Sequence, residues 1–405
     1  MNKLNEKSLD RRQLIKNAAL LSLAPTVPGF LRSAAAAQNE SKRILVVVQL
    51  SGGNDGLNTV IPFRDENYSA NRKRLQLPQD RILKLTDETA LHPAMGAMSD
   101  LLEDGRLAIV RGVGYPKPNR SHDVSMAVWH TASTDQEDHD GHGWLGKVLD
   151  RERSSQSEPQ SLLVADTEIP LALRGRKSRA IAMDSLTEFE VPTNSPVLSE
   201  NATASPLAEF MQRATLDAYE TADRMQDLLA AAENDSGSNL SRQRSSLARR
   251  LGVIAKLIAA DFGPRVYYCM QPGYDTHSDQ LQTHNDLLGT LSRSLKAFLD
   301  DVESLGRGRN VTVLCFSEFG RQVRENGSAG TDHGTAGPVF LAGSAIQPGI
   351  FGAHPDLSKL EQNAPQHTVD FRSVYASVLE DWLKVPAAEL LGKPASDHKK
   401  LPLFI

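Results

Sequence analysis

The sequence predicts an α/β fold with a mainly parallel central sheet flanked by helices. Continuous apolar runs rich in β-branched residues are typical of strands buried on both faces of a parallel sheet. Such runs occur at residues 44–50, 107–113, 265–271 and 311–316. Helical patterns lie between them, and strands that alternate with helices indicate parallel pairing. The 405-residue chain has no repeat or coiled-coil pattern, so one large core accounts for most of it.

The first 37 residues have the features of an export signal. Arg11 and Arg12 precede an apolar run at residues 18–24, and the alanines at residues 34–37 form a cleavage pattern. The run is too short, and too soon interrupted by prolines, to span a bilayer. A chance arginine pair in an ordinary secretory signal is the alternative. We expect residues 1–37 to be a twin-arginine signal peptide.

The mature chain is then expected in the periplasm or outside the cell, with the twin-arginine export machinery as a partner of its precursor. We expect residues 38–405 to form a single α/β domain with a helical segment at about residues 205–262 and no integral membrane segment. Without the six basic and two acidic residues of 1–37, the chain has 39 basic and 48 acidic residues and a net charge of about −9. This acidic excess argues against nucleic acid as a partner.

Three expected strands lead into side chains that could ligate a metal ion. The first strand is followed by a glycine-rich loop that carries Asp55, whose carboxylate suits a turn and a metal site equally well. The third is followed by Asp275 and His277, and the fourth by Glu318. His333 lies on the loop that comes next. A strand cap beside a surface histidine is the alternative interpretation.

The second strand leads to a helix that begins near Ser121. Serine is a preferred N-cap residue, and Arg120 and His122 flank it here. The functional alternative is a nucleophile favoured by a metal ion, the helix dipole and a guanidinium group. Arg120 and Arg321 are the candidates to stabilise developing negative charge. His122 suits a core or capping position as well as a ligand.

Parallel strands present their carboxyl ends at the same edge of a sheet, so these carboxylates and imidazoles are expected to lie close together. The expected ligands are Asp55, Asp275, His277, Glu318 and His333. Such donors suit one or two divalent ions. In a site with two ions, the ions hold the attacking and the leaving oxygen of the reaction. Zn, Ca, Mg and Mn all remain candidates.

Two cysteines, Cys269 and Cys315, lie inside the third and fourth expected strands. Free cysteine behaves as a small hydrophobic residue and is often buried. We interpret both as core residues and do not predict a disulfide, although export to an oxidising compartment would permit one.

Six segments carry a resemblance to a known family. They are QLSGGNDGLNTVIP (49–62), NRSHDVSMAVW (119–129), GWLGKVLD (143–150), YDTHSDQ (274–280), FSEFGR (316–321) and DHGTAGPVFLAG (332–343). Through them the mature chain resembles, over essentially its whole length, the bacterial family catalogued as domain of unknown function 1501. The order and placement of the same residues resemble the alkaline phosphatase and sulfatase superfamily.

The resemblance to the superfamily implies an alkaline-phosphatase-like fold and a role for each residue. Asp55 matches the superfamily's ligand after the first strand, and Ser121 matches its Ser, Thr or Cys nucleophile at a helix N-terminus. Asp275 and His277 match the Asp and His that hold one metal, at a shorter spacing than in alkaline phosphatase. His333 matches the late His ligand of the same metal.

The sequence departs from the superfamily pattern at Glu318 and Phe319, where an Asp-His pair is usual. The departure removes one imidazole from a second metal site, so the number of ions and the presence of catalysis stay open. The shorter spacing after Asp275 leaves His284 as an alternative ligand.

The resemblance implies an exported, metal-dependent hydrolase of phosphate or sulfate esters, with Ser121 as nucleophile and a small anionic ester or a glycan as substrate. The alternative is a non-catalytic, alkaline-phosphatase-like binding protein of the cell envelope. A redox enzyme exported with its cofactor is a third interpretation, but two isolated cysteines form no flavin, haem or cluster motif.

Overall fold

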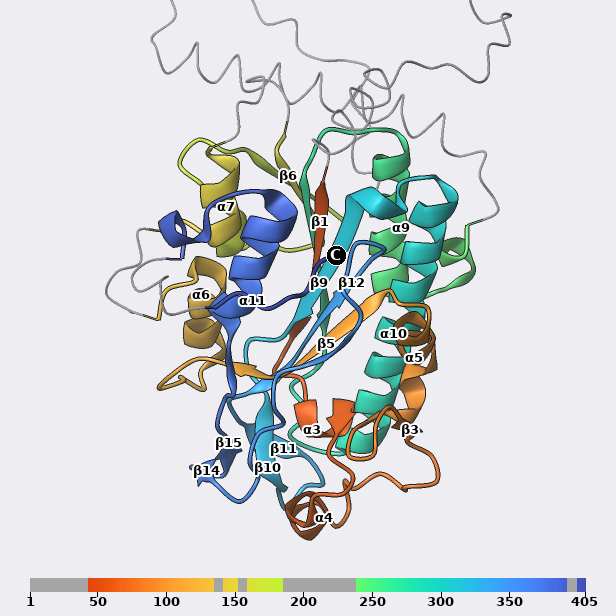
Figure 1. Cartoon of the computed structure of the whole chain (residues 1–405), viewed down its shortest axis with the longest axis vertical. Coiled ribbons are helices and arrows are strands. Elements are labelled where there is room, and N and C mark those ends of the chain that lie inside the picture. The colour runs from red at the N-terminus through yellow and green to blue at the C-terminus, as the bar shows by residue number, and fades with distance from the viewer. Residues whose placement is uncertain (1–42, 135–140, 152–158, 185–237, 392–398) are drawn as a thin grey trace, which may run out of the picture. The chain divides into compact units, whose positions relative to one another are not determined.

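The computed structural model of the chain describes residues 43–134, 141–151, 159–184, 238–391 and 399–405 (Figure 1). The expected signal peptide, residues 1–37, lies outside the described residues, and so do residues 205–237 of the expected helical segment. The rest of that segment contains one α-helix, α9 (Ser246–Ala259), and a 3-10 turn at Leu240–Arg242. None of the described helices combines the length and the apolar character needed to cross a membrane.

The main sheet has nine strands in the order β13-β5-β12-β9-β1-β8-β6-β7, with β16 paired to β5. Their bounds are β1 Ile44–Ser51, β5 Leu107–Gly114, β6 Ser161–Val164, β7 Ala180–Met183, β8 Val266–Pro272, β9 Val311–Phe316, β12 Gly337–Ala342, β13 Gly349–Phe351 and β16 Val369–Asp370. All pairs are parallel except those that β12 makes with β5 and β9. The prediction of a mainly parallel α/β sheet is therefore confirmed.

Helices cover both faces of this sheet (Figure 1). The alternation of side chains along β1 shows the two faces: Val46 and Val48 join one buried cluster, and Leu45 and Val47 join the other. The first cluster includes residues of α5 (Gly96–Glu103), α9 and α10 (Gln280–Ser304). The second includes residues of α6 (His122–Thr131), α7 (Trp144–Leu149) and α11 (Phe371–Ser377).

Short elements gather at one end of the main sheet, where Figure 1 shows α3, α4 and the β10–β11 hairpin. Over all the described residues, and not only at this end, the short helices are α3 Gly56–Thr59, α4 Glu66–Asn71, the 3-10 turns Pro93–Met95, Leu171–Leu173, Leu240–Arg242, Gly308–Asn310 and Ala387–Glu389, and a π-helix at Val378–Leu383. The short strands are β2 Val60–Ile61, β3 Leu83–Lys84, β4 Ala90–Leu91, β10 Arg321–Glu325, β11 Thr331–His333, β14 Leu360–Glu361 and β15 Ala364–Pro365. Since a hairpin rather than a crossover helix joins β9 to β12, β12 runs antiparallel to β9.

Cys269 and Cys315 are both buried and free, as the sequence indicates. Each lies opposite Val48 of β1, one in β8 and one in β9, so β1 separates them. Two strand spacings amount to about 10 Å, beyond the Cα separation of about 7 Å that a disulfide tolerates. Burial raises the pKa of Cys269 to about 12, so the thiol stays protonated at neutral pH.

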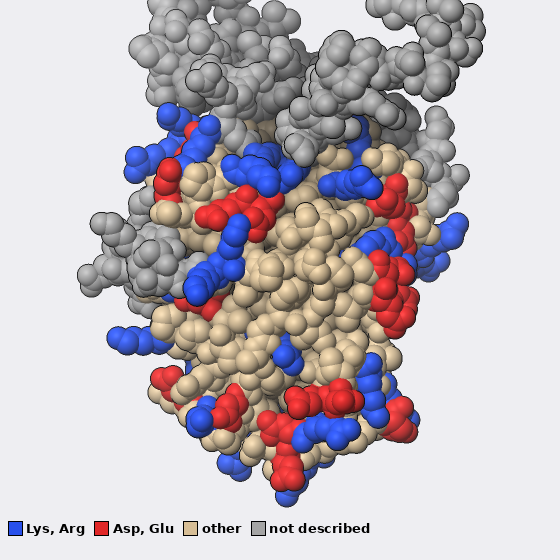
Figure 2. Space-filling model, viewed as in Figure 1, with Lys and Arg blue, Asp and Glu red and all other residues tan. Residues whose placement is uncertain are grey.

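On the face of the molecule in Figure 2, basic and acidic side chains are mixed in two regions, and a mostly uncharged area lies between these regions. Its described residues form no continuous basic patch on that face. The expectation that nucleic acid is not a partner stays a prediction.

Three buried histidines predict that the fold is labile to acid. Burial lowers the pKa of His92 to about 4 and those of His130 and His284 to about 3, from an ordinary value of 6.5. Below pH 6.5 the unfolded chain binds protons that the folded chain refuses, so stability falls as the pH falls toward the folded pKa values. Each group contributes a slope of about 1.4 kcal/mol per pH unit.

We therefore expect the free energy of unfolding to drop by about 4 kcal/mol per pH unit below pH 6 as these three groups titrate. Urea unfolding at pH 7, 6 and 5 measures it, and His284→Gln should reduce the slope. A urea midpoint that stays constant over this range would show that these imidazoles are not held neutral.

Candidate metal centre

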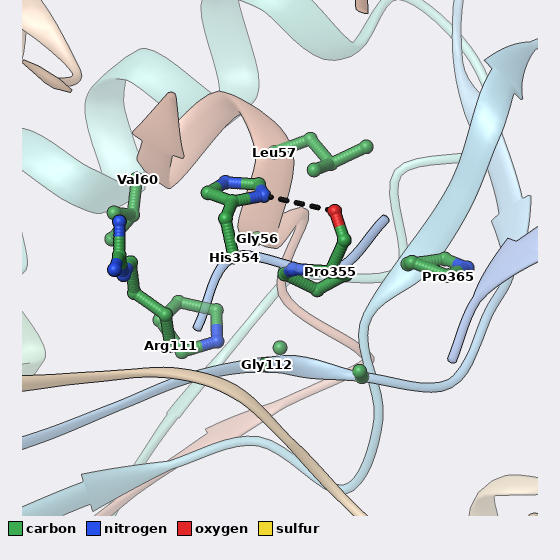
Figure 3. A pocket seen from close by; sticks show the side chains of 11 residues that line it. Gly56, Leu57, Val60, Arg111, Gly112, His354, Pro355 and Pro365 are labelled. Atoms are coloured by element: carbon green, nitrogen blue, oxygen red, sulfur yellow. Dashed lines mark hydrogen bonds between the residues drawn. The ribbon is translucent and has the colours of Figure 1, made fainter. Parts of the chain in front are cut away.

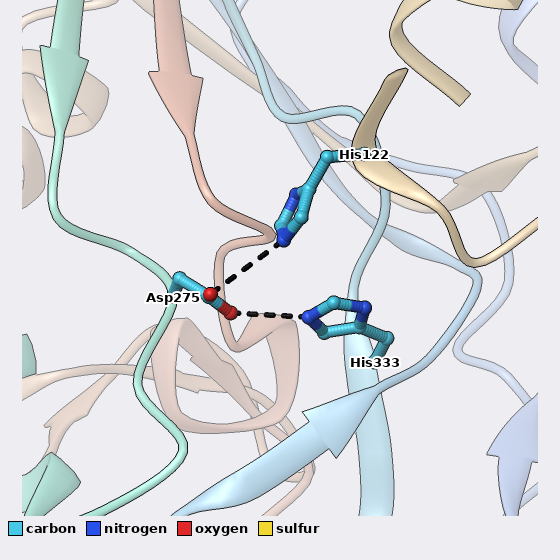
Figure 4. Close-up of side chains that lie close together, drawn as sticks. All are labelled: His122, Asp275 and His333. Carbon is cyan, nitrogen blue, oxygen red and sulfur yellow. Dashed lines mark hydrogen bonds and ion pairs between the residues drawn. The ribbon is translucent and has the colours of Figure 1, made fainter. Parts of the chain in front are cut away.

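The carboxyl ends of three neighbouring parallel strands meet at one edge of the main sheet. β1 ends at a glycine-rich loop, β8 leads to Asp275, and β9 leads to Glu318. Two further segments reach the same edge: α6 begins with His122, and β11 ends with His333. Figure 4 shows His122 and His333 pointing at the carboxylate of Asp275 from different elements.

Four side chains converge here on a small space. One ligand atom from each of His122, Asp275 and His333 lies within 4.8 Å of the other two. The His122 Nε2 atom is 3.6 Å from Asp275 Oδ2, and the His333 Nε2 atom is 3.1 Å from Asp275 Oδ1. His277 adds a third imidazole, with its Nε2 atom 3.0 Å from Asp275 Oδ1 and 2.9 Å from His333 Nε2.

Each of the three imidazoles has an oxygen acceptor behind it. The Nδ1 acceptors are Glu318 Oε1 for His122 at 2.8 Å, the Arg120 carbonyl oxygen for His333 at 2.8 Å, and Asp332 Oδ1 for His277 at 3.2 Å. With its proton on Nδ1 and bonded to this acceptor, each ring would turn the lone pair of its Nε2 atom toward the centre. Metal-binding histidines are held in this way by acceptors behind the ring.

The Nε2 atoms of His277 and His333 face each other at 2.9 Å. If both Nδ1 atoms carry the protons, two lone pairs point at one another, and His333 Nε2 also faces a carboxylate oxygen. A positive charge between the atoms relieves that repulsion. Imidazole nitrogens with one carboxylate oxygen suit Zn²⁺ or a similar transition-metal ion, whereas Ca²⁺ and Mg²⁺ prefer oxygen ligands only. The residues present therefore fit a divalent metal ion.

The electrostatics of the centre favour a bound cation. Burial alone would raise the pKa of Asp275, but Arg321 and His333 outweigh it and lower that pKa to about 2. The hydrogen bond to Glu318 raises the pKa of His122. Glu318 is itself buried, and it accepts a 2.8 Å hydrogen bond from the Gly52 N–H. Asp275 is thus ionised at neutral pH, and its negative charge lies where a cation would bind.

Asp275 is held in place by the β1 loop and by Arg321. A Cβ atom on Gly52 would lie 2.4 Å from the Asp275 backbone nitrogen, and Gly52 has φ +119°, so only glycine fits. The Arg321 side chain is buried, and it donates to Asp275 Oδ1 at 2.6 Å. It also donates to the carbonyl oxygens of Gly53, Thr331 and Tyr274 at 2.7–2.9 Å. Arg321 therefore ties the strand ends together, and its guanidinium does not face solvent.

The structure places the other expected catalytic residues at the rim of the centre. Arg120 donates through its guanidinium to the carbonyl oxygens of Glu361 and Gln362, at 2.8 and 3.0 Å. Ser121 is exposed at the N-cap position of α6, but its hydroxyl makes no capping hydrogen bond. The residues on either side of Ser121 both contact the centre, Arg120 through its carbonyl oxygen and His122 through its ring.

Asp55 lies outside the cluster, although the sequence suggested it as a ligand. Its two carboxylate oxygens pair with Arg72 at 2.5 and 2.9 Å, and Gln280 donates to one of them at 2.5 Å. Both charged side chains are fully buried. Glu318 was also expected to be a ligand, but its carboxylate is hydrogen-bonded to the His122 ring. It therefore supports a candidate ligand. His284 is buried beside Asn54, at 2.9 Å.

Sequence reasoning did not select His122 as a ligand. A histidine at the first position of a helix suits a cap or a core as well as a ligand, and the sequence signal was only its place beside Ser121. Its place in the candidate centre depends on Glu318 and Asp275, which follow strands far away in the sequence.

A separate pocket lies beside α3 and the start of β12 (Figure 3). Its walls are mostly apolar, and its polar side chains already have partners. Arg111 donates to the carbonyl oxygen of Gly352 and to the Thr89 hydroxyl, and His354 Nδ1 donates to the Pro355 carbonyl oxygen at 3.3 Å. None of the metal-centre residues lines this pocket, so we assign it no ligand.

Comparison with known proteins identifies one family. The model of a family described as "Protein of unknown function (DUF1501)" matches residues 41–382. No curated protein matches the chain.

Solved structures that match the chain have low identity to it. The PsFucS1 sulfatase from Pseudoalteromonas sp. is 10% identical, with a TM-score of 0.40, over 91% of this chain and 75% of that one. The lipoteichoic acid synthase LtaP from Listeria monocytogenes is 8% identical, with a TM-score of 0.37, over 77% and 68%. The zinc complex of the periplasmic domain of EcEptC from Escherichia coli is 9% identical, with a TM-score of 0.34, over 76% and 75%.

Proposed function

The chain belongs to the DUF1501 family, whose model spans residues 41–382, and on that premise we propose that it is a metal-dependent hydrolase of phosphate or sulfate esters. The observation that carries the proposal is the convergence of three imidazoles on Asp275, each backed by an acceptor that turns its Nε2 atom inward. Asp275 and His277 have side chains that are 48% and 45% exposed, so the centre is open to a substrate from solvent.

The proposed ligands are His122, Asp275 and His333, with His277 as a fourth. We propose a single ion, because Asp55 is neutralised by Arg72 and offers no free oxygen for a second one. Zn²⁺ fits the donor set best among Zn, Ca, Mg and Mn. A bound divalent ion would act as a Lewis acid toward an ester oxygen and favour the ionised form of a nearby hydroxyl.

Ser121 is the proposed nucleophile. It lies at the N-terminus of a ten-residue helix, where unpaired backbone N–H groups and the helix dipole favour negative charge. Its hydroxyl is free of the capping bond that would otherwise occupy it, and the next residue is a proposed ligand. The Arg120 guanidinium is bonded to the β14–β15 turn at the rim of the centre. Through this contact Arg120 would help to position a substrate rather than stabilise negative charge on it.

We expect Ser121→Ala to abolish ester hydrolysis while leaving zinc content and fold unchanged. Since the hydroxyl caps nothing, the variant should lose far less than the roughly 0.5–2 kcal/mol that removal of a working N-cap costs. Turnover of aryl phosphate and aryl sulfate esters, zinc content and urea unfolding measure the three effects. Equal turnover in wild type and variant would contradict the nucleophile. Loss of stability without loss of turnover would restore the capping role.

A non-catalytic binding protein of the cell envelope is the second candidate. The observation that favours it is that the guanidinium groups of Arg120 and Arg321 are bonded to backbone carbonyl oxygens rather than held free for an ester. Such a protein would hold the same ion and bind an anionic group or a glycan without turnover. Binding of a non-hydrolysable phosphonate with no ester hydrolysis would support this candidate over the first.

Export by the twin-arginine machinery is part of the proposal, because Arg11 and Arg12 precede an apolar run and an alanine-rich cleavage pattern. We expect a variant with both arginines replaced by lysine to accumulate as uncleaved precursor in the cytoplasm. Fractionation of cells that express the full chain measures this. Normal export of the lysine variant would show that an ordinary secretory signal is used instead.

A further inference from the structure

We propose that Phe319 is a positioning residue of the metal centre, whose ring fixes the directions in which His122 and His333 present their lone pairs. The inference rests on the proposed metal centre and adds a residue that makes no bond to the ion. Phe319 directly follows Glu318, so one short segment after β9 supplies both a hydrogen-bond acceptor and an aromatic surface to the ligands.

Both ligand rings pack on Phe319. The ring centroids of Phe319 and His122 are 4.9 Å apart with planes tilted by 36°, and those of Phe319 and His333 are 4.8 Å apart with a tilt of 35°. The two imidazoles also meet each other edge to face, at 4.4 Å and 72°. The three rings form one cluster, in which movement of either imidazole is limited by the phenyl ring.

The phenyl ring itself is fixed. Phe319 is 2% exposed. The β1 loop lies against it so closely that a Cβ atom on Gly53 would be 2.3 Å from its Cε2 atom. Gly53 has φ +79°, a conformation that glycine adopts readily. The chain thus places a glycine where a phenyl ring has to approach the backbone, and the ring has little freedom to turn.

A hydrogen bond at Nδ1 does not by itself fix an imidazole, because the ring can still rotate about that bond. The acceptors Glu318 and the Arg120 carbonyl oxygen therefore set the tautomers of His122 and His333 but leave their tilt free. Contact with a rigid flat ring removes that remaining freedom. Ligands that are already locked by packing and hydrogen bonds lose less entropy when an ion binds.

The contact should also strengthen when an ion binds. The face of a phenyl ring is electronegative, and an imidazole that coordinates a divalent ion carries more positive charge than a free neutral one. Phe319 would therefore interact more favourably with the ion-bound rings, as cations do with aromatic faces. An interaction that is stronger in the bound state raises affinity, rather than stability alone.

The test compares Co²⁺ binding by the wild-type chain and by two phenylalanine variants. Phe319→Leu keeps an apolar side chain but removes the flat ring. Phe316→Leu is the matched control: Phe316 is also 2% exposed, is the last residue of β9, and stacks on Trp129 with centroids 5.0 Å apart. Both variants should lower the free energy of unfolding, since each removes a buried ring.

We expect Phe319→Leu to weaken Co²⁺ binding by about 10-fold or more, as loss of an orienting partner does in other metal sites, and to shift the visible d–d bands. Phe316→Leu should leave Kd and spectrum unchanged. The same Kd and spectrum in Phe319→Leu as in wild type would overturn the inference but keep the metal centre. A wild-type chain that binds no Co²⁺ would overturn the metal centre itself. If Phe319→Leu does not give a folded circular dichroism spectrum, Phe319→Met, which is unbranched and flexible, replaces it under the same criteria.

Discussion

Replacing Asp275 by Ala is expected to weaken Zn²⁺ binding by at least about 100-fold, because even the loss of a group behind a ligand costs 10- to 100-fold. Asp275 is the only carboxylate among the described residues that faces the Nε2 atoms of His122, His277 and His333 together. Without it, three imidazoles converge with no carboxylate among them to balance the charge of a divalent ion. Titration of the mature chain with zinc, followed by calorimetry, measures the change.

The thermal midpoint provides a second measurement of the same change. A ligand that binds only the folded state stabilises it, so zinc should raise the midpoint of wild type and not that of Asp275→Ala. Asp356→Ala is the control, since this aspartate is exposed and pairs with Lys359 on a surface loop. An equal zinc-induced rise in Asp275→Ala and Asp356→Ala would mean that zinc is held elsewhere.

Replacing Arg72 by Ala is expected to lower the free energy of unfolding by about 3–5 kcal/mol, the cost of leaving a buried charge without its partner. Arg72 and Asp55 are both fully buried, and Arg72 also donates to the Val323 carbonyl oxygen at 2.9 Å. Urea unfolding measures the loss. Arg74→Ala is the control, because Arg74 is 50% exposed in its pair with Glu325 and such pairs contribute at most about 1 kcal/mol.

The same pair has a predicted pH dependence. Burial by itself would raise the pKa of Asp55, but Arg72 outweighs burial and holds that pKa below 3.8. The stabilisation by this pair is therefore complete above pH 3.8 and is lost as the pH falls through the lower pKa of the folded state.

A loss of stability in Arg72→Ala no larger than in Arg74→Ala would contradict the buried pair. Loss of zinc from Asp55→Asn at unchanged stability would make Asp55 a ligand after all.

The strands that carry the centre could be predicted from the sequence because their apolar runs are unbroken. Parallel pairing then places their carboxyl ends at one edge, and on that basis the sequence pointed to Asp275, His277 and His333. The structure brings these three together. The prediction needed only the positions of the strands and the side chains on the loops that follow them, both of which are local properties of the sequence.

The parts that could not be predicted depend on contacts between distant segments. Asp55 follows a strand as Asp275 does, and only the fold shows that Arg72 occupies its carboxylate. His122 suited a core or capping position as well as a ligand, because its partners, Glu318 and Asp275, lie more than 150 positions away in the chain. Phe319 looked like the loss of a ligand, and its packing against two imidazoles appears only in three dimensions.

Determination of the ion in the purified mature chain tests the central claim most directly. Elemental analysis, together with anomalous diffraction at the zinc edge, gives both the stoichiometry and the ligands. We predict one divalent ion per chain, bound by Nε2 atoms of His122 and His333 and by a carboxylate oxygen of Asp275. A chain that takes up no ion from micromolar zinc, or an ion bound away from Asp275 and His333, would contradict the account.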